Sequence, residues 1–290
     1  MRKELLEKVG VLLLRKGFTV RYLPRRWFDI VARKQGTILL VKALNDANSM
    51  SSELAAEMSR IGSVLSASPI IIAEKAGDFL EDDVVYLRFG VYTISISTFA
   101  KSLENNLPVM MKKNSGITVS IDGNRLSEII RSLGFSISDV SRRMGVSRQM
   151  VIRYKIEKSE ISVKKAEQMN RLFGDSIFKK VDIFSQRTNP EQIAHSRVAI
   201  KYENLGFRAS DTRKAPFDII AKGNNEIILT EVGDNHNPEV RSLTRLIDAS
   251  NLVIFDKKKP SDANIPHISR ESFLDINTAQ ELIKFLKEFD

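Results

Sequence analysis

LSEIIRSLGFSISDVSRRMGVSRQMVIRY, residues 126–154, has the pattern of two short helices joined by a tight turn and preceded by another helix. Gly145 falls where the first of the two helices must stop, because glycine enters the left-handed backbone region without a steric cost. Ser147 follows as a natural N-cap, with a side-chain oxygen that accepts from a free backbone amide. Apolar residues are spaced so that two crossed helices share one small core; they are Ile137, Val140, Met144, Val146 and Val151.

The second helix, residues 147–155, leaves mostly polar and basic side chains exposed. After Ser147 these are Arg148, Gln149, Met150, Arg153 and Lys155. Arginine and glutamine read guanine and adenine edges in the major groove, so the sequence predicts a helix-turn-helix motif at 136–155 that binds double-stranded DNA. We expect base contacts from Arg148, Gln149 and Arg153, and phosphate contacts from Ser136, Ser138 and Arg143. A helical hairpin buried in a protein core is the alternative, and the basic exposed face argues against it.

The segment resembles the Cro/CI-type (Xre) helix-turn-helix family. The resemblance rests on Leu126, Gly134, Phe135, Ser136, Val140, Ser141, Val151, Tyr154 and the turn at 144–147. The chain departs from the family at Ile137, where a glutamine that clamps the DNA backbone is often found. It departs again at Lys155, where an acidic residue often follows the aromatic one. Ser138, beside Ile137, is the expected substitute contact to phosphate.

Composition limits the class of protein. The chain has 290 residues, no cysteine and three histidines, so disulfides and thiolate metal sites are excluded and a histidine zinc site is not expected. We expect a cytoplasmic protein, with no signal peptide and no membrane span. The formal net charge is +9, and the basic excess lies before residue 183, which suits a polyanionic partner.

A repeated pattern lies on both sides of the 126–154 segment. Two short segments recur at a constant offset of 189 residues. Gly17-Phe18 matches Gly206-Phe207, and residues 27–33 (WFDIVAR) match residues 216–222 (PFDIIAK). The strand-like segments that follow match at the same offset and then at 182 and 174, as if the second copy had shorter loops. An ordered series of matches indicates an internal duplication.

Each copy predicts a helix, three strands, a helix, a buried strand, a short strand and a closing helix. The predicted fold class is therefore α/β plus all-α, with two small mixed-sheet domains flanking a helical, lambda-repressor-like one. We expect domains at 1–113, 117–182 and 190–290. The expected junctions are 114–116 and 187–190.

This element order resembles the restriction-endonuclease-like fold, whose members hold Mg²⁺ with an aspartate and a glutamate close to a lysine. Asp29 and Asp218 occupy the aspartate place. On the third strand the first copy has Lys42 without the glutamate, and the second copy has Glu231 without the lysine. We therefore expect domains without catalysis, metal or cofactor; the alternative is a metal-dependent nuclease or resolvase, with a site shared between the copies.

The whole arrangement resembles a family of archaeal transcriptional regulators with a central Cro/CI-type helix-turn-helix. The resemblance implies a sequence-specific DNA-binding regulator, but no known operon or effector. We expect a homodimer that is not an enzyme; an effector, if there is one, is unknown. A scaffold that uses the helical motif only for protein contacts is a further alternative. It predicts weak DNA affinity without sequence preference.

Overall fold

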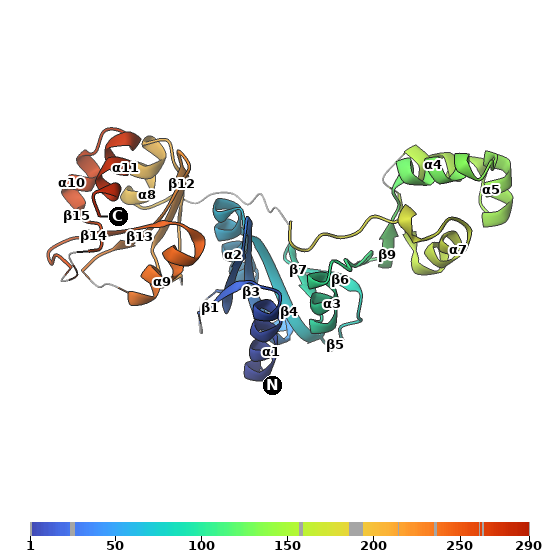
Figure 1. Ribbon diagram of the computed structural model, residues 1–290, viewed down its shortest axis with the longest axis horizontal. Helices are drawn as coiled ribbons and strands as arrows, with labels where there is room; N and C mark the ends of the chain where they lie inside the picture. Colours follow the sequence, from blue (N-terminus) through green and yellow to red (C-terminus); the bar gives the residue numbers. More distant parts are fainter. Residues whose placement is uncertain are drawn as a thin grey trace.

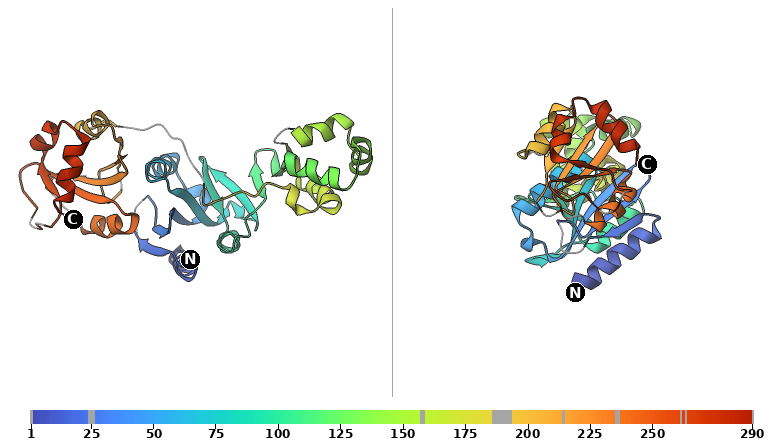
Figure 2. Two further views of the ribbon diagram at one scale, coloured as in Figure 1. Left: turned by 45° about the horizontal axis from the view of Figure 1, so that its top comes forward. Right: turned by 90° about the vertical axis from the view of Figure 1, so that its left-hand side faces the viewer.

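The computed structural model describes residues 2–289 except 24–26, 157–158, 186–193, 214, 235–236, 261 and 263. Three units follow one another along the long axis of the molecule (Figure 1). The first α/β unit lies between the second α/β unit and a helical unit, so the helical unit is at one end, away from the second α/β unit (Figure 2). None of the described helices is both long and apolar enough to cross a membrane.

The first unit is built on a mixed sheet with the order β1-β2-β3-β4-β7. Antiparallel pairing joins β1 to β2 and β2 to β3, and parallel pairing joins β3 to β4 and β4 to β7. The strands are β1 (Thr19–Tyr22), β2 (Ile30–Lys34), β3 (Thr37–Asp46), β4 (Ser68–Ala76) and β7 (Val91–Ile94). Two more strands flank them, β5 (Asp78–Phe79) beside β4 and β6 (Val84–Arg88) beside β7.

Strand β3 is buried on both faces, because its side chains alternate between two cores. Leu39 and Val41 share one core with α1 (Arg2–Arg15) and α3 (Ile96–Leu103). Ile38 and Leu40 share the other core with α2 (Ser52–Leu65). This explains why the strand reads as a nearly continuous apolar run and not as an alternating one.

The second unit repeats the strand order and the pairing directions of the first. Its sheet is β11-β12-β13-β14-β15, with two antiparallel pairs followed by two parallel pairs. The strands are β11 (Arg208–Asp211), β12 (Ile219–Gly223), β13 (Glu226–Val232), β14 (Ser250–Phe255) and β15 (His267–Ser269). The helices are α8 (Arg197–Asn204), α9 (Pro238–Ile247), α10 (Arg270–Asp275) and α11 (Ala279–Lys287).

The two α/β units pack against each other with reciprocal contacts. Helix α2 lies against β11 and β12, and α9 lies against β1 and β2. Arg33 of β2 pairs with Asp248 at the end of α9, at 3.7 Å. Lys222 of β12, which matches Arg33 at the offset of 189, donates to Ser66 Oγ at the end of α2, at 2.9 Å. An exchange of equivalent contacts is the signature of a two-fold arrangement, here within one chain.

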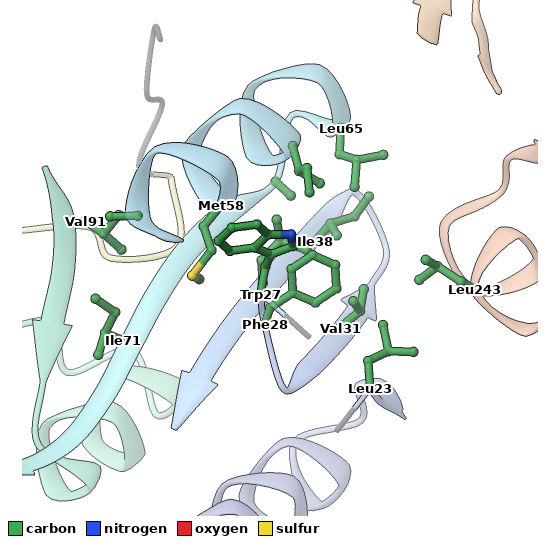
Figure 3. Packing of buried hydrophobic residues seen from close by; sticks show 14 of the residues in the cluster. Leu23, Trp27, Phe28, Val31, Ile38, Met58, Leu65, Ile71, Val91 and Leu243 are labelled. Carbon is green, nitrogen blue, oxygen red and sulfur yellow. The ribbon is translucent and has the colours of Figure 1, made fainter. Parts of the chain in front are cut away.

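One apolar core spans this interface. Trp27, Phe28 and Met58 of the first unit belong to the same buried cluster as Leu243 of α9, which approaches from the facing unit (Figure 3). Leu243 is 2% exposed, so separating the units would expose apolar surface. Burial of a leucine side chain contributes about 1.5–3 kcal/mol, which makes this a stable contact and not a loose one.

The helical unit begins with a hairpin that extends the first sheet. Strand β8 (Met110–Lys113) runs parallel to β6 and antiparallel to β9 (Gly116–Ser120), which also pairs with β10 (Glu160–Ser162). The turn of this hairpin lies at 114–116, where the sequence predicts a domain junction. Residues 187–190, the other expected junction, lie outside the described residues.

Four helices complete this unit around a separate core. They are α4 (Gly123–Ser132), α5 (Ile137–Met144), α6 (Arg148–Ile156) and α7 (Val163–Phe173). After them the chain returns along the first unit, where Val181 N donates to Pro108 O at 2.7 Å and Ile183 enters that unit's core. The chain thus passes between the first α/β unit and the helical unit twice, once before β8 and once near Val181, and these two segments are hydrogen-bonded to each other.

Candidate nucleic-acid interface

The two helices expected at 136–155 are α5 and α6, and their ends have the expected chemistry. Ser136 caps α5, its Oγ accepting from Asp139 N at 3.1 Å while Asp139 Oδ2 accepts from Ser136 N at 3.0 Å. Gly145 ends α5 in the left-handed conformation, with φ 59° and ψ 41°. Ser147 Oγ accepts from Met150 N at 3.2 Å at the start of α6. The turn predicted at 144–146, the helix end at Gly145 and the N-cap at Ser147 are confirmed; the cap at Ser136 was not among the predictions.

The turn between α5 and α6 is held from inside and from α7. Val140, Met144 and Val151 are each 1% exposed and form the predicted core, against which Ile137 and Val146 pack. Ser141 Oγ donates to Val146 O at 2.6 Å, which ties the turn to α5. Two α7 side chains bind the last carbonyls of α5: Lys165 Nζ donates to Met144 O at 2.8 Å and Gln168 Nε2 to Arg143 O at 3.0 Å.

Most of the DNA-binding residues predicted at 147–155 are exposed, among them the three predicted to read bases, Arg148, Gln149 and Arg153. Ser147, Arg148, Gln149, Met150 and Arg153 are all exposed. The helix carries three basic residues and no acidic one, so its exposed side is positive. Lys155 differs, because it is half-buried and follows Val151 by one helical turn, on the inward side. The structure therefore does not bring Lys155 together with the rest of the predicted site.

The three predicted phosphate-binding residues lie at the two ends of α5. Ser136 is exposed and Ser138 is half-buried, both at its start. The hydrogen bonds from Ser136 hold the pKa of the Asp139 carboxyl below its ordinary value, so the cap is ionised at neutral pH. Arg143, at the other end, is exposed and stacks with its guanidinium carbon 4.6 Å from the centroid of the Phe135 ring. The stack orients the guanidinium and leaves its edge for an anion.

Sequence reasoning missed three residues that support this surface. Lys165 and Gln168 position the end of α5 from a helix far along the chain, and no local pattern indicated that contact. Gly123 opens α4, and a Cβ atom there would lie 2.4 Å from Lys155 O. That close approach of α4 to the end of α6 requires glycine. A glycine directly after the N-cap Asp122 was the available signal.

Gly145→Ala is expected to lower the free energy of unfolding by about 1–2 kcal/mol, the cost of the left-handed conformation for a residue with a Cβ atom. No heavy atom lies within 4 Å of that Cβ position, so the effect comes from the backbone alone. Gly36→Ala, also without neighbours within 4 Å but not at a positive φ, is the control. Equal unfolding free energies for the two variants in chemical denaturation would contradict this assignment.

A second candidate site lies where Asp29 meets β3. Asp29 is 1% exposed, and its carboxylate is surrounded by donors. Oδ1 accepts from Arg2 Nη2 at 2.8 Å and from Lys42 Nζ at 3.1 Å, and Oδ2 accepts from Ala43 N at 3.0 Å. Burial lowers the pKa of Lys42, and the neighbouring Asp29 opposes that shift. The aspartate is thus the centre of a buried ion-pair cluster.

The equivalent residues of the second unit have a different environment. Asp218 keeps the bond to the next strand, its Oδ2 accepting from Val232 N at 2.7 Å, but the residue is exposed. Glu231, in the place of Lys42, is 3% exposed, with Oε2 accepting from Asn237 N at 2.5 Å and Oε1 facing Asn251 Nδ2 at 3.4 Å. The structure therefore places each pair on its own sheet, Asp29 with Lys42 and Asp218 with Glu231.

Neither unit fits the Mg²⁺ site of an endonuclease-like fold. Asp29 already accepts from two cationic side chains, and Leu40 stands where the second carboxylate belongs. Among the described residues no group of three or more His, Cys, Asp or Glu side chains could hold a metal ion. Mg²⁺ requires near-octahedral oxygen ligation, and these donor sets do not supply it.

The chain is similar to known proteins over its first α/β unit and, separately, over its full length. A family profile described as a PD-(D/E)XK superfamily domain matches residues 2–108, the first α/β unit. A Methanocaldococcus jannaschii protein named "Putative HTH-type transcriptional regulatory protein" is 30% identical, over 99% of this chain and 97% of its own length. Proteins of the same name from Archaeoglobus fulgidus and Pyrococcus horikoshii are 30% and 28% identical, each over 99% of this chain and 98% of their own length.

The chain belongs to the family that these archaeal HTH-type transcriptional regulatory proteins represent. The similarity extends over the full length, so it covers all three units. No solved structure matches the chain.

Proposed function

We propose that this chain is a transcriptional regulator that binds specific DNA sequences by placing α6 in the major groove. The observation that carries the proposal is the outward side of α6, where Arg148, Gln149 and Arg153 are exposed together beside a capped, glycine-terminated turn. Bidentate side chains on a short, rigidly held helix are what direct reading of base edges requires. The names of the archaeal relatives support the same function.

The helical unit is assigned to the Cro/CI-type (Xre) class on the residues between Leu126 and Tyr154. Proteins of this kind act as homodimers, so two copies of α6 would enter successive major grooves about 34 Å apart. The operator is then expected to be a palindrome with half-sites one helical turn apart. We expect the protein to act in the cytoplasm.

We further propose that the α/β units are the two products of a duplication, retained without nuclease activity. The matching strand orders and the reciprocal interface support the duplication. The Arg2 and Lys42 side chains on Asp29 support the loss of activity, because they neutralise the carboxylate without a metal ion. The units would then serve as a rigid body that carries the helical unit and orients it on DNA.

The alternative of a metal-dependent nuclease or resolvase is favoured by one observation, the PD-(D/E)XK match at 2–108. Incubating the chain and labelled duplex DNA with Mg²⁺ or Mn²⁺ separates the two functions. We expect intact DNA. Cleavage that disappears in both Asp29→Ala and Asp218→Ala would replace the regulator by a nuclease.

Arg143→Ala is expected to weaken binding to every DNA sequence and to flatten the dependence of log K on log salt by about one phosphate contact. The reason is that the Arg143 guanidinium is exposed in the last turn of α5 and stacks on Phe135, which leaves its edge for a phosphate. Equilibrium binding at several salt concentrations measures the slope. Arg197→Ala, at an exposed arginine at the start of α8, is the matched control and should leave the slope unchanged. An unchanged slope in Arg143→Ala would exclude a phosphate contact.

A further inference from the structure

The outward side of α6 carries apolar side chains among the polar ones. Val151 and Tyr154 are 1% and 6% exposed and fix the inward side of the helix. The opposite side of the helix carries a single stripe of four residues, because residues three or four positions apart lie on the same side. These residues are Gln149, Ile152, Arg153 and Ile156. Ile152 is 40% exposed and Ile156 78% exposed. Met150 adjoins the stripe and is 38% exposed.

Two exposed isoleucines share one side of this nine-residue helix with the exposed Arg153. The β-branched side chain lowers helix propensity, and exposure forgoes the gain from burial. Apolar residues occupy both sides of α6, and among the described residues the inward side is the one that packs into a core. A partner that covers the outward side would account for Ile152.

The charges beside Ile152 identify the class of partner. Arg148 and Arg153 are exposed on the same helix, which has no acidic residue. A partner must then offer negative charge and an apolar group within a few ångströms of each other. The major groove of DNA does so wherever a thymine 5-methyl group lies between the phosphate strands.

We propose that Ile152 is a specificity-determining residue that packs on the 5-methyl group of a thymine in the half-site. This inference rests on the proposed function and names the base that the helix prefers. Gln149 lies one turn before Ile152 on the stripe and Arg153 directly follows it, so the thymine contact falls between two positions read by hydrogen bonds. The half-site consequently contains an A·T pair in the middle of the segment that α6 covers.

Replacing thymine by deoxyuridine tests this directly, because it removes only the methyl group and keeps every hydrogen-bonding atom of the base edge. The probe is the duplex enriched by the full chain from a random DNA pool, with each half-site thymine substituted in turn. We expect one position at which uracil weakens binding of the wild-type chain about fourfold. This is the change in affinity that corresponds to the free energy of burying one methyl group. The Ile152→Ala variant should bind the thymine and uracil duplexes equally at that position.

Ile200→Ala is the matched control, since Ile200 is an equally exposed isoleucine (42%) on α8 of the second α/β unit. It should keep the wild-type preference for thymine. The inference is overturned if the wild-type chain binds every uracil duplex as tightly as thymine, or if Ile152→Ala retains the full difference. Absence of any sequence preference would overturn the proposed function as well, so the two failures are distinguishable.

Discussion

Asp29→Ala is expected to lower the free energy of unfolding by about 3–5 kcal/mol, the usual effect of removing one partner from a buried ion pair. The substitution leaves Lys42, which is 6% exposed, without its carboxylate and removes the acceptor of Ala43 N and of Arg2. Chemical denaturation monitored by the fluorescence of Trp27, two residues away, measures the change.

Asp218→Ala is the matched control for this prediction, because Asp218 is the equivalent residue and keeps the bond from Val232 N. It is exposed, and among the residues that the structure describes no cation forms an ion pair with it, so we expect only about 0.5–1.5 kcal/mol, the value of one hydrogen bond. Equal effects at the two positions would mean that the cluster around Asp29 is not what stabilises the first unit.

The deficit of Asp29→Ala should shrink as the pH rises. Burial already lowers the pKa of Lys42 below its ordinary 10.5, and loss of Asp29 removes the charge that opposes the shift. Between the lowered pKa and 10.5 the unfolded chain binds more protons than the folded one, so stability rises with pH in that window. In Asp29→Ala the pKa of Lys42 in the folded chain is lower still, so this pH range is wider. The free energy of unfolding of the variant therefore rises more with pH than that of the wild-type chain. A deficit that grows on going from neutral to alkaline pH would contradict this account.

Gln149→Ala is expected to weaken binding by about 1–3 kcal/mol at one base position of the operator and by much less when that position is already mutated. Gln149 lies on the side of α6 opposite Val151, where a bidentate amide can reach an adenine edge. Binding to the operator and to its single-position variants measures the coupling as a double-mutant cycle.

Gln280→Ala, at an exposed glutamine on α11, is the control and should leave every affinity unchanged. An equal loss for Gln149→Ala on all DNA sequences would show that Gln149 does not read a base. It would place the residue on the phosphate backbone instead.

Local signals in the sequence predicted the parts of the molecule that local chemistry determines. The motif predicted at 136–155, with its glycine at 145 and its serine at 147, located both ends of α5 and the start of α6 to within a residue. The helix expected after the third strand of the first copy is α2 (Ser52–Leu65), and the third strand expected in the second copy is β13 (Glu226–Val232). Helix caps and apolar runs depend on residues that are close together in the sequence, so the positions of these helices and strands can be predicted from the sequence alone.

Contacts between distant segments could not be predicted in the same way. The backbone amide of Arg213 donates a hydrogen bond to Glu57 Oε1 at 3.1 Å. This bond joins the two α/β units although its partners are 156 residues apart in the sequence. Arg2 reaches Asp29 from a helix whose sequence reads only as amphipathic. The sequence at 114–116 predicts a domain junction, because Asn, Ser and Gly mark a turn there as well as in the hairpin of β8 and β9 that the structure has. In each case the deciding partner is remote in sequence.

The central claim is that α6 reads a specific DNA sequence. Its most direct test is selection by the full chain from a random duplex DNA pool near physiological salt, with a chelator present to prevent metal-dependent cleavage. The account predicts enrichment of one motif, a palindrome with half-sites one helical turn apart. Binding that is retained without enrichment of any motif would contradict it.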